Sequence, residues 1–340
     1  MPGTFVDPFL ADGYSVIEMT EAINRLPYNI YSRTQELGLF REEPVSTTSV
    51  MVEEQGGTLN LLPTIVRGAP HLVNRSAKRK ARSFAVPQIV LDDLVLPSEV
   101  QGVRAFGATA QTDTLAAAIA RKLQTMKNKH DITKEWMRVG ALKGILLDGD
   151  GSTVLYNFFT EFGMTPFVQD FGFSSDTLDV NAAVLNIKRH MEDNLHGEVM
   201  TGVRALCSPE FFSALVGHPN VQKAFQYFMT TQPLGYDYRQ GFNYAGVTFE
   251  EYRGTATDLT GTSHKFIAAN TAQFFPVGTL TTFVMYNAPA DYNETVNTPG
   301  LPYYAKQAVR KFDEGWDLTT QSNPFPICLR PELLVQGTMS

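Results

Sequence analysis

The chain has 340 residues, of which 43% are hydrophobic and 19% charged, and its formal net charge at pH 7 is −7. This composition is that of a globular protein with a sizeable core, and it excludes disorder along the whole chain. A negative net charge argues against general wrapping of nucleic acid, which needs a positive field. Because the sequence shows neither a run of 18 apolar residues nor a signal-peptide pattern, we expect a protein made and used in a cytoplasm, or in something assembled there.

The first forty residues predict an arm that lies on something larger. Short apolar groups alternate with turn formers, and a short helical stretch spans residues 16–26 before Pro27. A segment of this length cannot bury its own apolar side chains. We therefore expect Phe5 and Phe9 to contact another surface.

Residues 45–97 predict an extended β-hairpin. Apolar residues alternate loosely with polar ones from Val50 onward, and a second apolar run spans residues 82–95. A polar and basic tip at residues 68–80 joins the two runs. A lone two-stranded ribbon is marginally stable in water, so we expect this ribbon to lie on a neighbouring surface.

Residues 112–147 carry the strongest helical signal in the chain. Apolar residues recur at three- and four-residue spacing on both sides of a polar stretch at residues 128–131. We expect that stretch to bend or break the helix. A tight turn at residues 149–151 and a strand over residues 153–159 are predicted to follow.

The rest of the chain predicts interleaved helices and strands. A helix begins at Ser208 and Pro209, because serine caps a first turn and proline fits its first position. Further helices are expected at residues 180–195 and 221–228. Strands are expected at residues 203–207, 247–252, 266–269, 282–286, 317–321 and 327–329. This interleaving predicts the α+β class with antiparallel sheets.

The sequence shows no motif typical of catalysis, and we predict that the protein is not an enzyme. It contains no GxSxG elbow, phosphate-binding loop, dinucleotide fingerprint or HExxH pattern. A hydrolase stays an alternative, because a Ser-His-Asp triad is assembled in space and leaves no sequence spacing. Base-stacking aromatic platforms are a further alternative to core and interface packing for the Phe- and Tyr-rich stretches.

No metal or cofactor site is expected. Residues 148–152 resemble the start of a calcium loop, but Thr153 and Phe159 stand where that loop needs Gly and Glu, so a hairpin turn is predicted. Cys207 and Cys328 lie far apart and form no ligand spacing. They predict buried free thiols rather than a disulfide or a metal site.

Several segments resemble the phage major capsid protein E family, which includes the lambda capsid protein. One run begins at Phe283-Val284-Met285-Tyr286-Asn287-Ala288-Pro289-Ala290-Asp291, continues through Pro302-Tyr303-Tyr304-Ala305-Lys306 and ends at Gln321-Ser322-Asn323-Pro324. The segment Cys207-Ser208-Pro209-Glu210-Phe211-Phe212 agrees with it, as does a basic hairpin followed by a long helix that ends at Gly149-Asp150-Gly151. The order of these segments along nearly the whole chain carries the resemblance.

The resemblance implies the Hong Kong 97-type phage capsid fold. Its parts would be an N-terminal arm at 1–44, an extended loop at 45–97, an axial domain at 178–285, and a peripheral domain with the spine helix at 98–177 and 286–340. It also implies a structural subunit whose hexamers and pentamers form an icosahedral head around double-stranded DNA. A shell protein of a bacterial nanocompartment with the same fold is the alternative that the resemblance leaves open.

The partners that the resemblance implies are copies of the same chain, a portal protein, a scaffolding protein and, as an optional partner, a decoration protein. Packaged DNA would be touched only by weak, non-specific contacts. No acidic or helical prefix precedes the arm in this sequence, so we expect scaffolding to come from a separate protein.

One basic cluster stands out, consisting of Arg75, Lys78, Arg79, Lys80 and Arg82. No acidic residue occurs between Glu54 and Asp92. The cluster fits three roles: a phosphate-binding patch, a solvated loop, or an intersubunit contact with an acidic surface of a neighbour. We favour the third role, and we expect the arm and the ribbon to satisfy their apolar and charged groups mainly on other copies of the chain.

Overall fold

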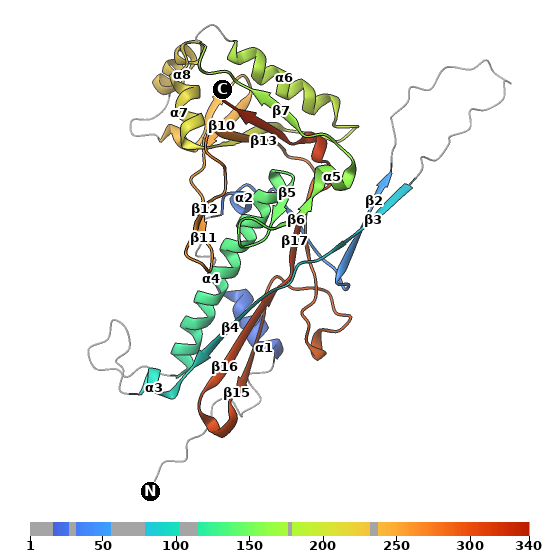
Figure 1. The fold of residues 1–340 in the computed structure, drawn as a ribbon, viewed down its shortest axis with the longest axis vertical. Coiled ribbons are helices and arrows are strands. Elements are labelled where there is room, and N and C mark those ends of the chain that lie inside the picture. The colour runs from blue at the N-terminus through green and yellow to red at the C-terminus, as the bar shows by residue number, and fades with distance from the viewer. Residues whose placement is uncertain are drawn as a thin grey trace, which may run out of the picture.

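The computed structural model describes residues 16–26, 32–55, 79–101, 115–175, 179–231 and 237–339. A long helix, α4 (Leu115–Leu142), runs through the middle of the molecule and connects a lower part to an upper part (Figure 1). It is one continuous helix through residues 128–131, so the expected break is absent. Among the described residues, no helix combines the length and the apolar content needed to cross a membrane.

The lower part is a three-stranded antiparallel sheet packed against the first half of α4. Its order is β15 (Tyr304–Val309), β16 (Trp316–Ser322) and β4 (Ile89–Val95). Helix α1 (Val16–Arg25) also packs here, and α3 (Pro97–Val100) follows β4. The shared core contains Met19, Ile23, Val95, Ile119, Leu123 and Leu318.

The predicted hairpin of residues 45–97 is divided between two sheets. Strand β2 (Ser49–Gln55) pairs with β3 (Arg79–Ala85), but the next strand, β4, pairs with β16 instead. The interval between β3 and β4 contains Pro87, which has no backbone N–H to donate to a ladder. The second strand of the predicted hairpin therefore ends at Ala85 and does not continue to residue 95 as expected.

Several apolar side chains in the described parts of the arm and ribbon are buried within the same chain, so the expectation that other copies cover them is wrong for these side chains and stays a prediction for the rest. Phe84 is 1% exposed, and its ring centre lies 5.7 Å from that of Phe325 and 6.4 Å from that of Phe158. In α1, Met19 and Ile23 are equally buried. Neither segment can bury these side chains alone, but α4 and the C-terminal strands supply the covering surface.

The upper part is a six-stranded sheet covered by helices α6 (Val180–Asp193), α7 (Pro209–Gly217) and α8 (Pro219–Thr231) (Figure 1). The strand order is β7 (Phe167–Asp170), β18 (Val335–Thr338), β13 (Thr271–Val277), β8 (Gly202–Cys207), β10 (Val247–Glu251) and β9 (Phe242–Tyr244). Ser208 caps α7 by accepting the Phe211 N–H at 3.2 Å, as the sequence predicts.

Two of the sheets in the described residues are mixed, whereas the sequence predicts antiparallel sheets throughout. Strand β8 runs parallel to β10, and β18 runs parallel to β7. Parallel neighbours need a crossover connection, and helices α7 and α8 lie in the chain between β8 and β10. In a separate three-stranded sheet, β1 (Arg41–Pro44) runs parallel to β14 (Phe283–Asn287), which pairs antiparallel with β17 (Pro324–Cys328).

One further strand prediction is confirmed only in part, and another is wrong. Residues 153–159 form the short β6 (Val154–Asn157) and then helix α5 (Phe158–Phe162), because Asn157 caps a helical turn by accepting the Thr160 N–H. Residues 266–269 are a loop between β12 (Ser263–Lys265) and β13. The remaining elements are α2 (Arg33–Glu36), β5 (Ile145–Leu147), β11 (Thr255–Thr257) and the 3-10 turns Tyr238–Gln240, Asn293–Thr295, Lys311–Asp313 and Pro331–Leu333.

Candidate functional site

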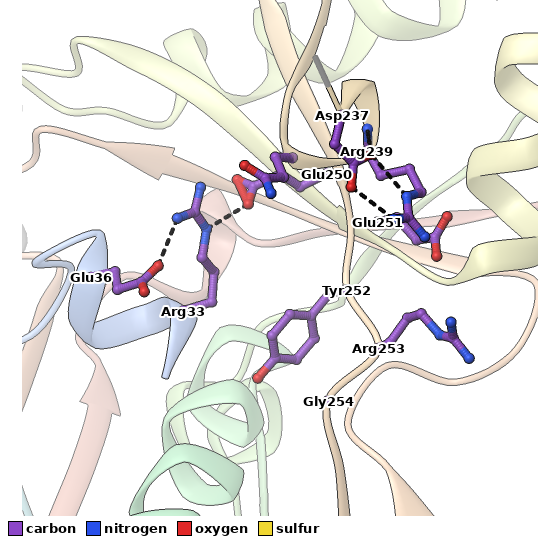
Figure 2. Close-up of a pocket in the computed structure, with 10 residues that line it drawn as sticks. Arg33, Glu36, Asp237, Arg239, Glu250, Glu251, Tyr252, Arg253 and Gly254 are labelled. Carbon is purple, nitrogen blue, oxygen red and sulfur yellow. Dashed lines mark hydrogen bonds and ion pairs between the residues drawn. The ribbon is translucent and has the colours of Figure 1, made fainter. Parts of the chain in front are cut away.

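A buried polar joint connects α2, α4 and the end of β10. The Glu250 side chain on β10 is 6% exposed and lies between two arginines. Nε of Arg33, on α2, lies 2.5 Å from its Oε1, and Nη1 of Arg204, on β8, lies 2.7 Å from its Oε2 (Figure 2 shows the Arg33 side). Two charge-assisted contacts thus compensate for the burial of this carboxylate.

A second buried carboxylate, Glu135 of α4, ties together three segments. It accepts hydrogen bonds from the hydroxyls of Ser32 and Thr34, and from the Thr34 backbone N–H at 3.2 Å. The hydroxyl of Tyr252, which follows β10, donates to Oε1 at 3.1 Å. Four donors compensate for the burial of this carboxylate. Glu135 therefore attaches the start of α2 and the chain after β10 to the long helix.

One turn further along α4, Arg138 extends the joint. Its Nη1 donates to Oε1 of Gln35 at 3.1 Å, and its Nη2 lies 3.1 Å from Oε1 of Glu42. Its Nε lies 3.2 Å from Sδ of Met285 on β14. The segment from α2 to β1 is therefore held on α4 by polar contacts in addition to apolar ones.

An open cleft of about 570 Å³ lies beside this joint, between α2, the turn at residues 238–240 and the chain after β10 (Figure 2). Its charged lining consists of Arg33, Glu36, Asp237, Arg239, Glu250, Glu251 and Arg253. Arg33 pairs with Glu36 at 2.9 Å, and Arg239 pairs with Asp237 at 2.7 Å. Each of these two pairs lies within one segment, whereas the contact of Arg33 with Glu250 joins α2 to β10.

A second buried seam joins α4 to the segment before β15. Burial lowers the pKa of Lys134 to about 7, with a further contribution from the charge of Arg138. Burial also lowers the pKa of His130 to about 4, assisted by repulsion from Lys134. Burial raises the pKa of Asp131, against the hydrogen bond that Tyr303 donates to it. Two residues of the polar stretch that suggested a helix break are thus buried with partners, His130 with the Thr320 hydroxyl at 3.0 Å and Asp131 with the Tyr303 hydroxyl.

The predicted contact residues are only partly within the described structure. Phe5, Phe9, Arg75 and Lys78 lie outside the described residues. Arg79 begins β3, and Lys80 beside it is exposed. Arg82 lies at the base of the ribbon, where its guanidinium carbon is 5.0 Å from the ring centre of Phe162 in the same subunit. The intersubunit role of this cluster stays a prediction.

The smaller motif predictions are resolved by the local geometry. Asp150 accepts hydrogen bonds from the backbone N–H groups of Ser152 and Thr153 at 2.9 and 2.8 Å, which confirms a hairpin turn between β5 and β6. Within the described ranges, no group of three or more side chains is placed to hold a metal ion. Cys207 and Cys328 are both buried free thiols, as predicted, and burial raises the pKa of each.

Sequence reasoning missed the residues of the polar joint. Glu135 and Arg138 stand in the second half of α4, where nearly every side chain is buried although many are polar. The charges themselves were the available signal. The partners, Tyr252 for Glu135 and Glu42 for Arg138, lie about a hundred residues away.

Comparison with known proteins gives one consistent result. The family model described as phage major capsid protein E matches residues 15–339. The major capsid protein of Pseudomonas phage KPP10 is 32% identical over 346 aligned residues, which cover 97% of this chain and 98% of that protein.

Two solved structures have a similar arrangement of the chain. A crystal structure assigned to a capsid protein of an Escherichia coli CFT073 prophage gives a TM-score of 0.57 at 13% identity, covering 94% of this chain and 97% of that one. The capsid of Ralstonia phage GP4 gives a TM-score of 0.53 at 11% identity, covering 100% and 98%. At these identities the likeness shows a shared fold.

Proposed function

This chain belongs to the phage major capsid protein E family, and from that premise we propose that it assembles with copies of itself into the icosahedral head of a tailed phage. Its fold is the Hong Kong 97-type capsid fold, of the α+β class. The proposal includes hexamers and pentamers that enclose double-stranded DNA in the virion, after assembly in the host cytoplasm. The observation that carries it is the family match along residues 15–339.

We keep the division expected from the sequence as part of the proposal: an arm at 1–44, an extended loop at 45–97, an axial domain at 178–285 and a peripheral domain in the rest. The six-stranded sheet and its helices support an axial unit, to which β7 and β18 are added in space. The joint at Glu135 and Glu250 supports a fixed connection between that unit and α4.

Assembly would rest on many weak contacts made at once. Contacts between unlike surfaces form closed rings only where the rotation that relates neighbouring copies completes a full turn. Several such contacts per subunit raise the effective affinity. The ribbon β2–β3 supports this scheme, because its described end leaves the body of the subunit (Figure 1) and its base is anchored by Phe84. Arg79 and Lys80 would then meet an acidic surface of a neighbour.

The proposed partners beyond the chain itself are a portal protein, a separate scaffolding protein and a decoration protein. DNA would make weak, non-specific contact with the inner surface. The net charge of −7 supports this weak contact, because strong phosphate binding would need a positive surface.

Negative-stain microscopy of the purified, overexpressed chain tests the proposal. We expect polyhedra or tubes, and small discrete particles alone would contradict it. Reversing the charges of Arg79 and Lys80 to Glu should block shell formation and leave the subunit folded. The matched control is the same double reversal at Lys188 and Arg189, an adjacent basic pair on α6, which should still form shells. Normal shells from the Arg79 and Lys80 variant would rule out the role of the ribbon.

A further inference from the structure

The tip of the β15–β16 ribbon holds an aromatic residue in an unfavourable position. Phe312 is 91% exposed and has a φ of 64°, and Asp313 next to it has a φ of 56°. Left-handed backbone is uncommon outside glycine and is an outlier for a bulky residue. The subunit therefore combines backbone strain with an exposed aromatic ring at one position, and no contact among the described residues compensates for either cost.

The tip is fixed in place rather than loosely attached. The Arg310 N–H donates to the Gly315 carbonyl at 3.0 Å, and Nε of Arg310 lies 3.3 Å from the Asp317 carboxylate. Gly315 is buried, and a Cβ there would lie 2.5 Å from the Val95 carbonyl oxygen of β4. Close packing of the ribbon on β4 thus holds the backbone next to Phe312 in place, which lowers the ordering cost of a contact.

The charges around Phe312 are self-complementary. Lys311 precedes it and Asp313 and Glu314 follow it, and all three are exposed. No ion pair from these three to another described residue is present. A partner surface with charges of one sign would repel either Lys311 or the two acidic residues of the tip. A second tip, turned about a shared axis, offers an anion to each cation and a ring to each ring.

We propose that the tips of neighbouring copies meet in a homotypic contact in which Phe312 rings pack together and Lys311 of one copy pairs with Asp313 or Glu314 of the next. This contact rests on the self-assembly proposed above. It lies at the end of the molecule opposite α7 and α8 (Figure 1), far from the ribbon β2–β3 and independent of it. Aromatic pairs add specificity beyond the area they bury.

The first test is the variant Phe312→Gly. Glycine adopts the left-handed backbone freely, so the thermal stability of the unassembled subunit should be unchanged or higher. The yield of sedimentable shells should fall about tenfold or more, because each tip loses the burial of one aromatic ring. A variant with lower thermal stability, or one with normal stability and full shell yield, would overturn the proposal.

The second test asks what Phe312 meets. Cys207 and Cys328 are buried, so Phe312→Cys introduces a thiol that differs from both in being exposed. Mild oxidation, or a short bismaleimide, should link subunits of assembled shells through position 312. The matched control is Leu259→Cys at the tip of the β11–β12 hairpin, where the native side chain is fully exposed and linking is not expected.

The outcomes separate this contact from the assembly it depends on. Absent linking at position 312, or equal linking at position 259, overturns the homotypic contact while shells themselves still form. Failure of the unsubstituted chain to form shells would overturn the proposed function, and with it the contact.

Discussion

Nζ of Lys134 lies 3.4 Å from the centre of the Tyr303 ring and donates a hydrogen bond to the Pro302 carbonyl at 2.7 Å. The hydroxyl of the same tyrosine donates to Asp131, one turn earlier on α4. Tyr303 therefore compensates a buried cation with its ring and a buried anion with its hydroxyl. This arrangement fastens the start of β15 to the long helix.

The variant Tyr303→Phe should destabilise the unassembled subunit by about 1–3 kcal/mol, because Asp131 would stay buried without the tyrosine donor. Its other carboxylate oxygen already has no hydrogen-bond partner. Denaturant unfolding of the purified subunit measures the loss. Tyr227→Phe is the control, since Tyr227 is 73% exposed and its replacement should change little. Equal effects of the two variants would contradict the role of the seam.

Acidification should weaken the same seam through His130. Its pKa is about 4 in the folded subunit and 6.5 when exposed, so the unfolded chain binds more protons between these values. Stability is present above pH 6.5 and is lost as pH falls toward 4, by up to about 1.4 kcal/mol per pH unit. Lys134, with a pKa of about 7, is largely protonated throughout this window, and the raised pKa of Asp131 opposes the trend.

The contribution of His130 is isolated by comparing unfolding at pH 6.5 and pH 5 for the natural chain and for His130→Gln. Glutamine does not titrate, so the variant should lose less stability over this interval. Indistinguishable losses would show that other groups govern the pH dependence.

Phe84→Ala should cost the unassembled subunit about 3–5 kcal/mol, the range for removing a large buried aromatic. The ring packs within its own subunit against Phe158, Phe162 and Phe325. Met51→Ala on the paired strand, at a side chain that is 68% exposed, should stay within about 0.5 kcal/mol. Thermal unfolding of the unassembled subunit measures both variants. An unchanged stability of Phe84→Ala would contradict burial within the subunit and favour covering of the ribbon by other copies.

Glu250→Gln should destabilise the joint beside the cleft by about 3 kcal/mol, because Arg33 and Arg204 would face each other with no anion between them. Glu36→Gln is the matched control on the other side of Arg33. Its side chain is 49% exposed, and a surface pair contributes less than about 1 kcal/mol. If both variants behaved alike in denaturant unfolding, the burial of Glu250 would not matter for the joint.

The sequence by itself determined the features that neighbouring residues control. The start of α7 follows from Ser208 and Pro209, the β5–β6 turn follows from Asp150, and the order of segments identified the family. The helix start and the turn depend on contacts within a few residues, so a short stretch of chain determines them.

The remaining features depend on partners that are distant in the chain, so they become visible only in the folded molecule. Whether β4 continues the ribbon or joins β16 depends on a strand more than two hundred residues away. The polar residues 128–131 do not break α4, and the two buried ones, His130 and Asp131, find partners in Thr320 and Tyr303, far away in the chain. The burial of Phe84 and Glu135 likewise needs surfaces that folding brings together, and no local pattern encodes a surface that does not yet exist.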